Sequence, residues 1–404
     1  MEFENTKVRW VRGLQWSAAA VAAAVLAACG GGGGGGSSAA ADGTLRVALT
    51  DAPSCGYDHV WVTVEKVRVH QSSSAADADT GWAEITLATP RRVDLLALTN
   101  GALEELGSTQ LAAGSYSQIR LVLSANSGTN ATANAVQPTG GAVTALTTPS
   151  GQQSGLKLQA NFVVASGQTA DLVLDFDACK SVVKAGNSGQ YILKPVMTVL
   201  PRVTSSTIQG AVATTLPLAK TTVAAQQNGV TVRSTTPDAT GNFALPYLPI
   251  GTYTLVITSD AHATGVVTGV PSGSTPTVVS TPTTAITLPT STMADIGGVV
   301  TSGTAIPPVL VTDATARALQ ALTGGPTIEV ASKPVDGLLA SYQFRVPVAA
   351  PVKAAYAAGS ALTWTADTAG AGKYTIQIQA PGRATQDKPA DVSASSAVTV
   401  NFGY

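Results

Sequence analysis

The sequence predicts a mainly β, multi-domain protein. Many short segments alternate apolar and polar residues with a period of two, which is the pattern of a strand with one buried face. The 40 glycines and 22 prolines, together with abundant Thr, Ser, Val and Ala, favour turns and short strands over helices. A chain of 404 residues has the length of roughly two to four domains.

The charge composition excludes two classes of protein. Only 12% of the residues are charged and the net charge is −1, while apolar residues run through the whole length, so a highly charged disordered chain is excluded. The 23 Lys and Arg residues are scattered and form no basic stripe, so no nucleic-acid partner is expected.

The first 28 residues have the features of an export signal. Lys7, Arg9 and Arg12 form a positive segment, and residues 13–28 are almost entirely small and apolar. This apolar stretch is short for a membrane span, so residues 1–28 are predicted to be a signal peptide.

The end of this signal, Leu26-Ala27-Ala28-Cys29, resembles the bacterial lipobox. The resemblance implies transfer of diacylglycerol to the Cys29 sulfur, cleavage before Cys29, and acylation of its new amino group. Gly30 in place of aspartate resembles the pattern for release to the outer membrane. A plain secretory signal that ends by chance at a cysteine is the alternative.

Residues 29–41 are rich in Gly, Ser and Ala and are predicted to be a flexible tether. A random coil of this length reaches about 20 Å, enough to hold a folded body clear of a lipid surface. Two or more acyl chains give stable membrane anchoring where a single chain does not. The membrane, reached through this covalent lipid, is therefore a predicted partner.

The chain has three cysteines. If Cys29 is lipidated, two free thiols remain, those of Cys55 and Cys179. In an oxidising compartment two remaining thiols most simply form one disulfide. Two buried thiols are the alternative. A zinc site is not expected, because the chain has no Cys-x-x-Cys spacing and only three histidines.

The first folded body, residues 42–203, is predicted to consist of strands. The apolar positions change parity between Val64 and Val67, which predicts a β-bulge near Glu65 and Lys66. A helical turn is expected only at residues 102–106. The other predicted strands are 45–49, 60–64, 93–98, 116–123, 162–164, 171–177 and 191–200.

Several motifs of this body resemble a bacterial lipoprotein family known as domain of unknown function 4382. They are Gly43-Thr44-Leu45-Arg46-Val47, Thr50-Asp51-Ala52-Pro53, Val93-Asp94-Leu95-Leu96, Gly114-Ser115-Tyr116-Ser117-Gln118-Ile119-Arg120 and Asp175-Phe176-Asp177-Ala178-Cys179. The resemblance covers roughly 160 residues and implies a β-sandwich-like exported domain without an assigned activity.

Residues 207–288 resemble the carboxypeptidase regulatory-like, or transthyretin-like, β-sandwich, which implies a spacer or binding platform. The motif is Asp238, Gly241, Phe243, Leu245, Leu248, Pro249, Gly251, Tyr253 and Leu255. It predicts an antiparallel hairpin in which Gly251 takes a positive φ and Tyr253 and Leu255 share one strand face.

Residues 295–404 resemble residues 207–288 and are predicted to form a diverged second β-sandwich repeat. Residues 208–212 recur as 296–300, and residues 251–255 recur as 372–376. The alanine-rich insertion at residues 349–358 interrupts the repeat, and either a helical turn or a long loop is compatible with it.

Candidate cation ligands are Asp51, Asp171, Asp175 and Asp177. The last three alternate along one predicted strand and so share a face, and a Cys55–Cys179 bridge would bring Asp51 near them. Clustered carboxylate oxygens suit calcium. The alternative is that alternating aspartates mark the solvent face of the strand. Apart from the covalent lipid, calcium is the only cofactor that the sequence suggests.

Aromatic residues are candidates for stacking on sugars: Trp61, Trp82, Tyr247 and Trp364, with Tyr57 beside them. Exposed rings stack on sugar faces, whereas burial in a core is the commoner fate of aromatic side chains.

No catalytic constellation is evident, so the protein is predicted not to be an enzyme. No serine motif accompanies the three histidines, His59, His70 and His262, so a nucleophilic triad is not indicated. The carboxylates of Glu104 and Glu105 are adjacent in the chain, so they would not flank a glycosidic bond from its two sides. An isopeptide bond between Lys220 and Asp238 is a further alternative.

The predicted function is that of a lipid-anchored cell-envelope protein, most simply at the outer membrane, with a structural, adhesive or partner-binding role. Its partner would be an envelope protein or a glycan. A carbohydrate- or peptidoglycan-binding module is the alternative, and an envelope hydrolase comes third.

Overall fold

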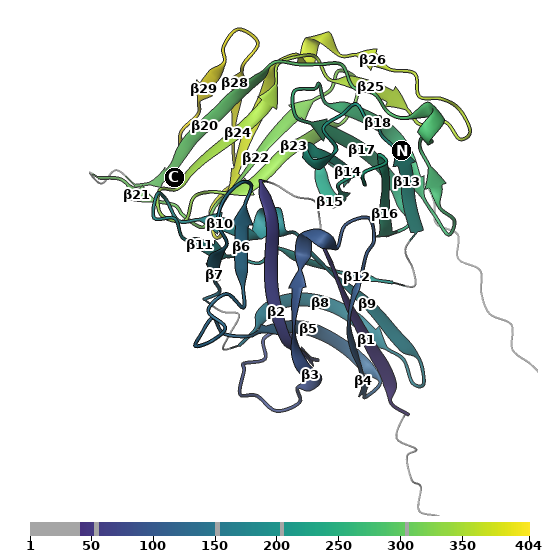
Figure 1. Ribbon diagram of the computed structural model, residues 1–404, viewed down its shortest axis with the longest axis vertical. Helices are drawn as coiled ribbons and strands as arrows, with labels where there is room; N and C mark the ends of the chain where they lie inside the picture. The colour runs from purple at the N-terminus through teal and green to yellow at the C-terminus, as the bar shows by residue number, and fades with distance from the viewer. Residues whose placement is uncertain (1–40, 52–55, 150–153, 203–205, 304–306) are drawn as a thin grey trace, which may run out of the picture. The chain divides into compact units, whose positions relative to one another are not determined.

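The computed structural model describes residues 41–51, 56–149, 154–202, 206–303 and 307–404. These residues form six β-sheets that pair into three β-sandwiches (Figure 1), which confirms the mainly β, multi-domain prediction. Within the described ranges, the helices are single short turns, and none has the length and apolar character needed to cross a membrane.

The first sandwich contains a four-stranded sheet in the order β12-β9-β1-β4. Strand β1 pairs antiparallel with β4 and parallel with β9. The four strands are β1 (Gly43–Asp51), β4 (Glu104–Leu111), β9 (Thr169–Phe176) and β12 (Met197–Pro201).

The opposite sheet of the first sandwich has eight strands, seven in the order β10-β11-β7-β6-β2-β5-β8 and β3 paired with β2. Its strands are β2 (Tyr57–His70), β3 (Ala83–Asp94), β5 (Gly114–Leu123), β6 (Ala135–Pro138), β7 (Thr144–Thr147), β8 (Leu156–Val164), β10 (Val182–Lys184) and β11 (Tyr191–Leu193). The one-turn helices η1 (Leu95–Ala97) and α1 (Ala178–Ser181) connect strands of the two sheets.

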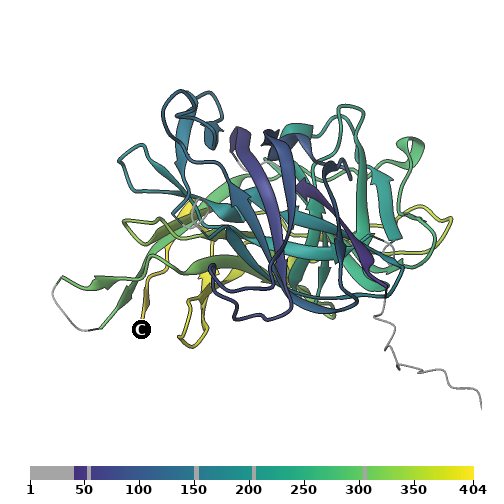
Figure 2. The same cartoon turned by 90° about the horizontal axis from the view of Figure 1, so that it is seen from below.

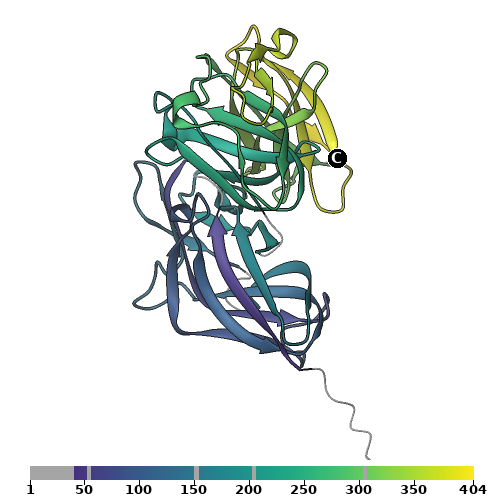
Figure 3. The same cartoon turned by 90° about the vertical axis from the view of Figure 1, so that its right-hand side faces the viewer.

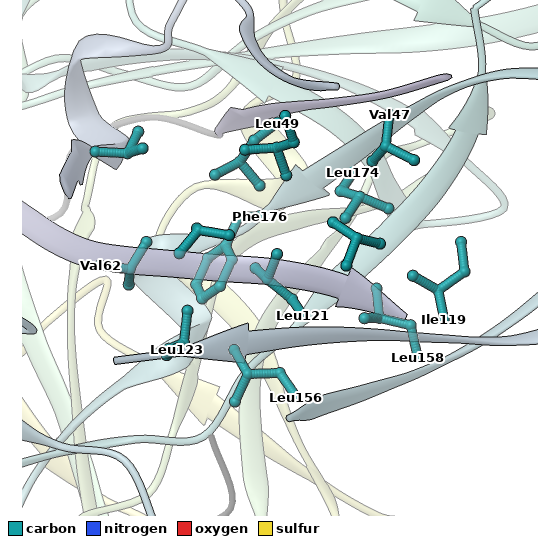
Figure 4. Close-up of a cluster of buried hydrophobic side chains, with 14 of the residues drawn as sticks. Val47, Leu49, Val62, Ile119, Leu121, Leu123, Leu156, Leu158, Leu174 and Phe176 are labelled. Carbon is teal, nitrogen blue, oxygen red and sulfur yellow. The ribbon is translucent and has the colours of Figure 1, made fainter. Parts of the chain in front are cut away.

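Both sheets of the first sandwich direct their alternating apolar residues into one core (Figure 4). Val47 and Leu49 of β1 and Leu174 and Phe176 of β9 meet Leu121 of β5 there, and all five are 0% exposed. The period-two pattern therefore identified the buried face correctly.

The predicted bulge in the long strand β2 is confirmed. The register with both neighbouring strands shifts between Val64 and Lys66, so that Val64 and Val67 both point into the core. An extra residue between them restores the buried face after the change of parity.

Three local expectations in this sandwich are wrong. The strand expected at residues 93–98 ends at Asp94, because residues 95–97 form the helical turn η1. Residues 102–106 do not form a helical turn, because β4 begins at Glu104 and places Leu106 in the core. The strand expected at residues 191–200 is split by Pro195 into β11 and β12, which belong to opposite sheets.

The second sandwich pairs a three-stranded sheet, β16-β13-β19, with the sheet β15-β14-β17-β18-β25-β26. Its strands are β13 (Ser206–Ala211), β14 (Thr221–Gln227), β15 (Val230–Thr235), β16 (Asn242–Leu248), β17 (Gly251–Ser259), β18 (Gly265–Ser272) and β19 (Thr277–Val278), with the helical turns η2 (Leu218–Lys220) and η3 (Pro282–Thr284).

The antiparallel hairpin predicted for this sandwich is wrong, because its two strands belong to opposite sheets. Strand β16 pairs with β13 and strand β17 pairs with β14 and β18, so the turn at Pro249 leads from one sheet to the other. Gly251 does not adopt a positive φ, whereas Tyr247 does, at 61°. The Tyr253 hydroxyl donates a 2.8 Å hydrogen bond to the Pro249 carbonyl and so holds the crossing.

The third sandwich consists of β20 with its partners β21, β24, β29 and β30, and of the sheet β23-β22-β27-β28. The strands are β20 (Met293–Ser302), β21 (Val309–Leu310), β22 (Thr315–Ala321), β23 (Thr327–Pro334), β24 (Ser341–Pro347), β27 (Lys373–Gln379), β28 (Gln386–Asp391), β29 (Ala397–Thr399) and β30 (Phe402–Gly403), with the turn η4 (Thr368–Gly370). Figure 2 shows the β20–β21 hairpin projecting from this sandwich.

The second and third sandwiches repeat the same topology. Strand β13 pairs antiparallel with β16 and parallel with β19, as β20 does with β24 and β29. The registers also correspond, because Gly210 lies opposite Phe243 and Gly298 lies opposite Tyr342. A side chain at either glycine would collide with its surroundings, so both repeats need a glycine here.

The alanine-rich insertion forms neither of the two structures considered for it. It contributes β25 (Val352–Ala355), which pairs parallel with β18 and antiparallel with β26 (Thr365–Ala366), and so extends a sheet of the second sandwich. Val352 and Trp364 pack against the core of that sandwich. Strands of the two repeats consequently lie side by side (Figures 1 and 3).

Candidate functional site

A buried ion pair joins the first sandwich to the second. An oxygen of Asp175, on β9, lies 2.8 Å from a guanidinium nitrogen of Arg233, on β15, and their side chains are only 9% and 2% exposed. Arg233 also donates to the Thr50 hydroxyl at 3.3 Å. Burial removes water from the Asp175 carboxylate and raises its pKa, although the charge of Arg233 acts in the opposite direction.

Asn100 makes the second contact between these two sandwiches. It adopts a left-handed backbone conformation, with φ of 54°, which asparagine tolerates better than most residues. Its side-chain amide donates to the Thr236 carbonyl at 3.0 Å and accepts from the backbone N–H of Ala244 at 3.0 Å. A single side chain thus satisfies polar backbone groups at the ends of β15 and β16.

Glu329, on β23, is a meeting point of all three sandwiches. Its carboxylate accepts a 2.5 Å bond from Arg317 and a 3.0 Å bond from the Thr231 hydroxyl, and lies 3.6 Å from the Lys180 ammonium group. Its backbone exchanges two hydrogen bonds with the Gln226 side chain. Burial acts to lower the pKa of Lys180, but the carboxylates of Asp177 and Glu329 raise it overall.

Asp336 ties the third sandwich to the first. Its two carboxylate oxygens accept from the backbone N–H of Gly186 at 2.9 and 2.8 Å, and one of them also accepts from Leu338 and Leu339 at 2.8 Å. Lys194 adds a 2.7 Å hydrogen bond to the Thr312 carbonyl. These contacts of the junction are charged and polar.

A cleft of about 1040 Å³ opens beside this junction and is lined by residues of all three sandwiches. Its size is at the upper end of the range of ligand pockets. The cleft walls carry more cations than carboxylates; its charged residues are Asp177, Lys180, Lys184, Lys220, Asp260, Glu329, Lys333, Asp336 and Arg345. We take this cleft as the candidate functional site.

Tyr57 lines the same cleft, and its phenol is difficult to ionise. Burial, with a contribution from nearby Tyr191, raises the Tyr57 pKa to about 12. The folded protein therefore holds this proton more tightly than the unfolded chain, and the stability that Tyr57 contributes is complete below pH 10.

We expect this contribution to be lost as the pH rises from 10 toward 12, by about 1–2 kcal/mol. Urea unfolding at several alkaline pH values measures it, and Tyr57→Phe should flatten that part of the pH dependence. Tyr356→Phe, at a half-buried tyrosine outside the cleft, is the control. An equal effect of the two variants would contradict the prediction.

The four candidate cation ligands make separate structural contacts. Asp51 accepts from the backbone N–H of Ala178 at 2.9 Å, and Asp177 caps α1 by accepting from the N–H of Lys180. Asp171 lies 3.7 Å from both Arg46 and Arg202. The described ranges contain no group of three His, Cys, Asp or Glu residues that could hold a metal ion, and calcium binding stays a prediction. The Asp175 side chain is buried, so at this position the strand does not have the solvent face that the alternative assumes.

The four candidate stacking residues are all half-buried, and three of them carry a guanidinium group over a ring. Arg92 lies 4.3 Å from the Trp61 ring, whose neighbour His59 stacks on it at 4.7 Å. Trp82 has Arg68 and Arg120 at 4.5 Å each. The Arg233 guanidinium group lies over the Tyr247 ring. Trp364 packs against the core of the second sandwich. Sugar stacking by these residues stays a prediction.

The residues weighed for catalysis are dispersed. His59 bonds Asp94 at 2.5 Å, His70 contacts the Thr80 carbonyl and His262 contacts the Asp260 carbonyl. Glu104 and Glu105 pair with Arg91 and Arg202. Lys220 and Asp238, the candidate pair for an isopeptide bond, have different partners. Lys220 lies 3.1 Å from Asp260, while Asp238 accepts hydrogen bonds from Thr240 and Asn242.

The lipidation and disulfide predictions fall mainly outside the described residues. Cys29 and Cys55 are both outside them, while Cys179 lies in α1. Lipid attachment and the Cys55–Cys179 disulfide therefore stay predictions.

No sequence motif identified the junction residues Arg233, Glu329, Arg317 and Gln226. A signal was available for Arg233, because it is the only charged residue between Lys220 and Asp238, in an otherwise apolar and hydroxyl-rich strand region. An isolated arginine in such a segment is usually paired when it is buried.

Comparison with protein families assigns part of the first sandwich. Residues 42–195 match the family described as "Domain of unknown function (DUF4382)". This match supports the resemblance of the N-terminal body, while the carboxypeptidase regulatory-like resemblance of residues 207–288 stays a prediction. The search of curated proteins returned no match.

Solved structures similar to this chain include a streptococcal ancillary pilin, at 9% identity over 89% of this chain and 99% of that chain, with a TM-score of 0.16. The major pilin subunit BcpA of Bacillus cereus shows 9% identity over 90% and 99%, with a TM-score of 0.16. Two B repeat units of the collagen-binding protein of Staphylococcus aureus show 10% identity over 90% and 99%, with a TM-score of 0.18. At these TM-scores the likeness carries no functional argument.

Proposed function

We propose that the protein is a lipid-anchored component of the cell envelope with a structural, adhesive or partner-binding role and without catalysis. The observation that carries the proposal is the order of the segments. A signal ending in Leu26-Ala27-Ala28-Cys29 is followed by a Gly/Ser/Ala tether, and the first strand begins at Gly43 immediately after that tether. This is the order required to hold a folded β body near a membrane, with the outer membrane as the proposed location.

The junction supports a structural or presenting role. Residues 40–404 form one compact unit, within which Asp175–Arg233, Glu329 and Asp336 connect the three sandwiches. Buried ion pairs lose much of their stabilisation when either partner moves away, so these contacts favour a fixed arrangement of the sandwiches over independent movement.

Lipid attachment is tested by replacing the proposed acceptor. We expect the full-length protein to incorporate an alkyne-labelled fatty acid in bacterial cells and to fractionate with membranes. Cys29→Ser should lose the label and leave the membrane fraction, because serine lacks the sulfur that the transfer requires.

The matched control is Ser37→Ala, a change within the same tether that should alter neither labelling nor fractionation. Incorporation of label by the Cys29→Ser variant equal to that of the wild type would overturn the assignment of Cys29. Absence of label from the wild type would overturn lipid anchoring itself.

A carbohydrate- or peptidoglycan-binding role is the second candidate, and the cleft of about 1040 Å³ is the observation that favours it. Polar walls that combine hydroxyl, amide and charged groups suit a polar ligand, because they match sugar hydroxyls with donors and acceptors.

A further inference from the structure

Two lysines in the cleft have no anionic partner among the described residues. Lys184 ends β10 in the first sandwich, and Lys333 lies near the end of β23 in the third. Both side chains are exposed to the solvent of the cleft, and neither ammonium group makes a hydrogen bond or ion pair within the described ranges. Lys333 lies 5.5 Å from the Phe344 ring, which is a weak substitute for a carboxylate.

The carboxylates of the cleft are already occupied by donors. Glu329 accepts from Arg317 and Thr231, and Asp336 accepts from backbone N–H groups. Asp260 is shared by two cations, Lys220 at 3.1 Å and Arg345 at 3.4 Å. The charge that remains unmatched in the cleft is therefore positive, and a ligand that completes it has to be anionic.

The surroundings of Lys333 support the same conclusion. Although Lys333 as a whole is exposed, protein atoms around its ammonium group remove part of the hydration of that group and lower its pKa. A partly desolvated ammonium group without a counter-ion is unfavourable, so an anion that enters the cleft gains more from Lys333 than from a fully hydrated surface lysine.

Uncharged polar side chains complete the walls and point to a sugar. Asn187, Thr222, Thr258, Ser332 and Gln343 all line the cleft, and their side chains make no hydrogen bonds within the part of the chain that the structure describes. These five residues come from all three sandwiches. Hydroxyl and amide groups that remain available can donate to and accept from successive sugar hydroxyls.

We propose that the cleft binds an acidic glycan, with Lys184 and Lys333 contacting its carboxylates and the neutral polar walls contacting its hydroxyl groups. The proposal rests on the partner-binding role proposed above and names the chemical class of the partner. It concerns non-covalent binding and involves no bond making or breaking.

The test measures binding of purified full-length protein in detergent to oligogalacturonate, which carries a carboxylate on every ring. A neutral maltodextrin of the same length and inorganic phosphate are compared with it. We expect binding of oligogalacturonate that weakens with added salt, and little binding of maltodextrin or phosphate.

The variant Lys184→Gln/Lys333→Gln removes both ammonium groups while keeping two long polar side chains. Its affinity should fall by roughly tenfold per lysine, because each one contributes a charge-assisted hydrogen bond. The control Lys157→Gln/Lys373→Gln changes the net charge equally at two exposed lysines outside the cleft and should bind like the wild type.

Equal losses in the two double variants, or no binding of oligogalacturonate by the wild type, would overturn the proposal. Equal binding of maltodextrin would show that the ligand need not be anionic, and binding of phosphate alone would show that it need not be a glycan.

Fatty-acid labelling of the Lys184→Gln/Lys333→Gln variant should be unchanged. A failure of the glycan-binding proposal is thereby distinguished from a failure of the proposed lipid anchoring. A melting temperature equal to that of the wild type shows that the variant is folded.

Discussion

Replacing Arg233 with methionine is expected to destabilise the protein by about 3–5 kcal/mol. The substitution leaves the Asp175 carboxylate 9% exposed and without its counter-ion, and it also removes the contact to Thr50. Burial already raises the pKa of Asp175, so the carboxylate would take up a proton at still higher pH in the variant. Urea unfolding of the full-length chain, followed by tryptophan fluorescence, measures the change.

Two comparisons separate the ion pair from a loss of packing. The double variant Asp175→Leu/Arg233→Met removes both charges and should recover a large part of the lost stability. Arg345→Met removes a cation that is 61% exposed and lies 3.4 Å from Asp260, so less than about 1 kcal/mol should be lost. A loss for Arg233→Met as small as that of Arg345→Met would show that the buried pair contributes little.

Gly298→Ala is expected to cost about 2–3 kcal/mol. A Cβ atom at this position would lie 2.0 Å from the Val400 carbonyl oxygen and 3.0 Å from the Tyr342 hydroxyl, which itself donates to that carbonyl. The obstacle is backbone, so it cannot be relieved by rotating a side chain. Thermal unfolding and urea unfolding both measure the loss.

The equivalent substitution in the other repeat, Gly210→Ala, should also destabilise, by about 1–3 kcal/mol. Its Cβ would lie 2.6 Å from the Ser280 hydroxyl oxygen and 2.7 Å from the Phe243 ring. Gly273→Ala is the control, because a Cβ there has no neighbour within 4 Å and the residue does not need a positive φ. Equal stability of Gly298→Ala and Gly273→Ala would contradict the requirement for glycine.

The local patterns predicted those parts of the fold that depend on neighbouring residues. Alternation along β1, β2 and β9 identified which side chains enter the core, and the change of parity at Glu65 located the bulge in β2. Repeated motifs in residues 208–212 and 296–300 predicted two related sandwiches, and the strands that carry these motifs pair in the same way.

One error arose because the same local pattern is compatible with two strand pairings. A strand, a Pro-Gly turn and a second strand describe a hairpin, and they equally describe the passage from β16 to β17 in opposite sheets. The alternation of aromatic and apolar residues does not distinguish these, because each strand has one buried face in both cases.

The candidate site could not be predicted, because its contacts join distant parts of the sequence. Arg233 and Thr50 are 183 positions apart, and Glu329 and Gln226 are 103 apart. An isolated charged residue in the sequence indicates that a partner is needed but does not identify it. The cleft charges are evident only after the ion pairs have been assigned in three dimensions.

The insertion that supplies β25 has a consequence for the history of the two repeats. Strand β18 is paired on one side by β17 of its own repeat and on the other by β25 from the next, and Val352 enters the core of the earlier repeat. A recombination event that cut the chain at residues 289–292 would separate β18 from β25. The product with the second sandwich would keep β18 as an unpaired sheet edge, and the other product would carry β25 without its pairing partner. The two repeats are therefore expected to have been inherited as a pair since the insertion arose.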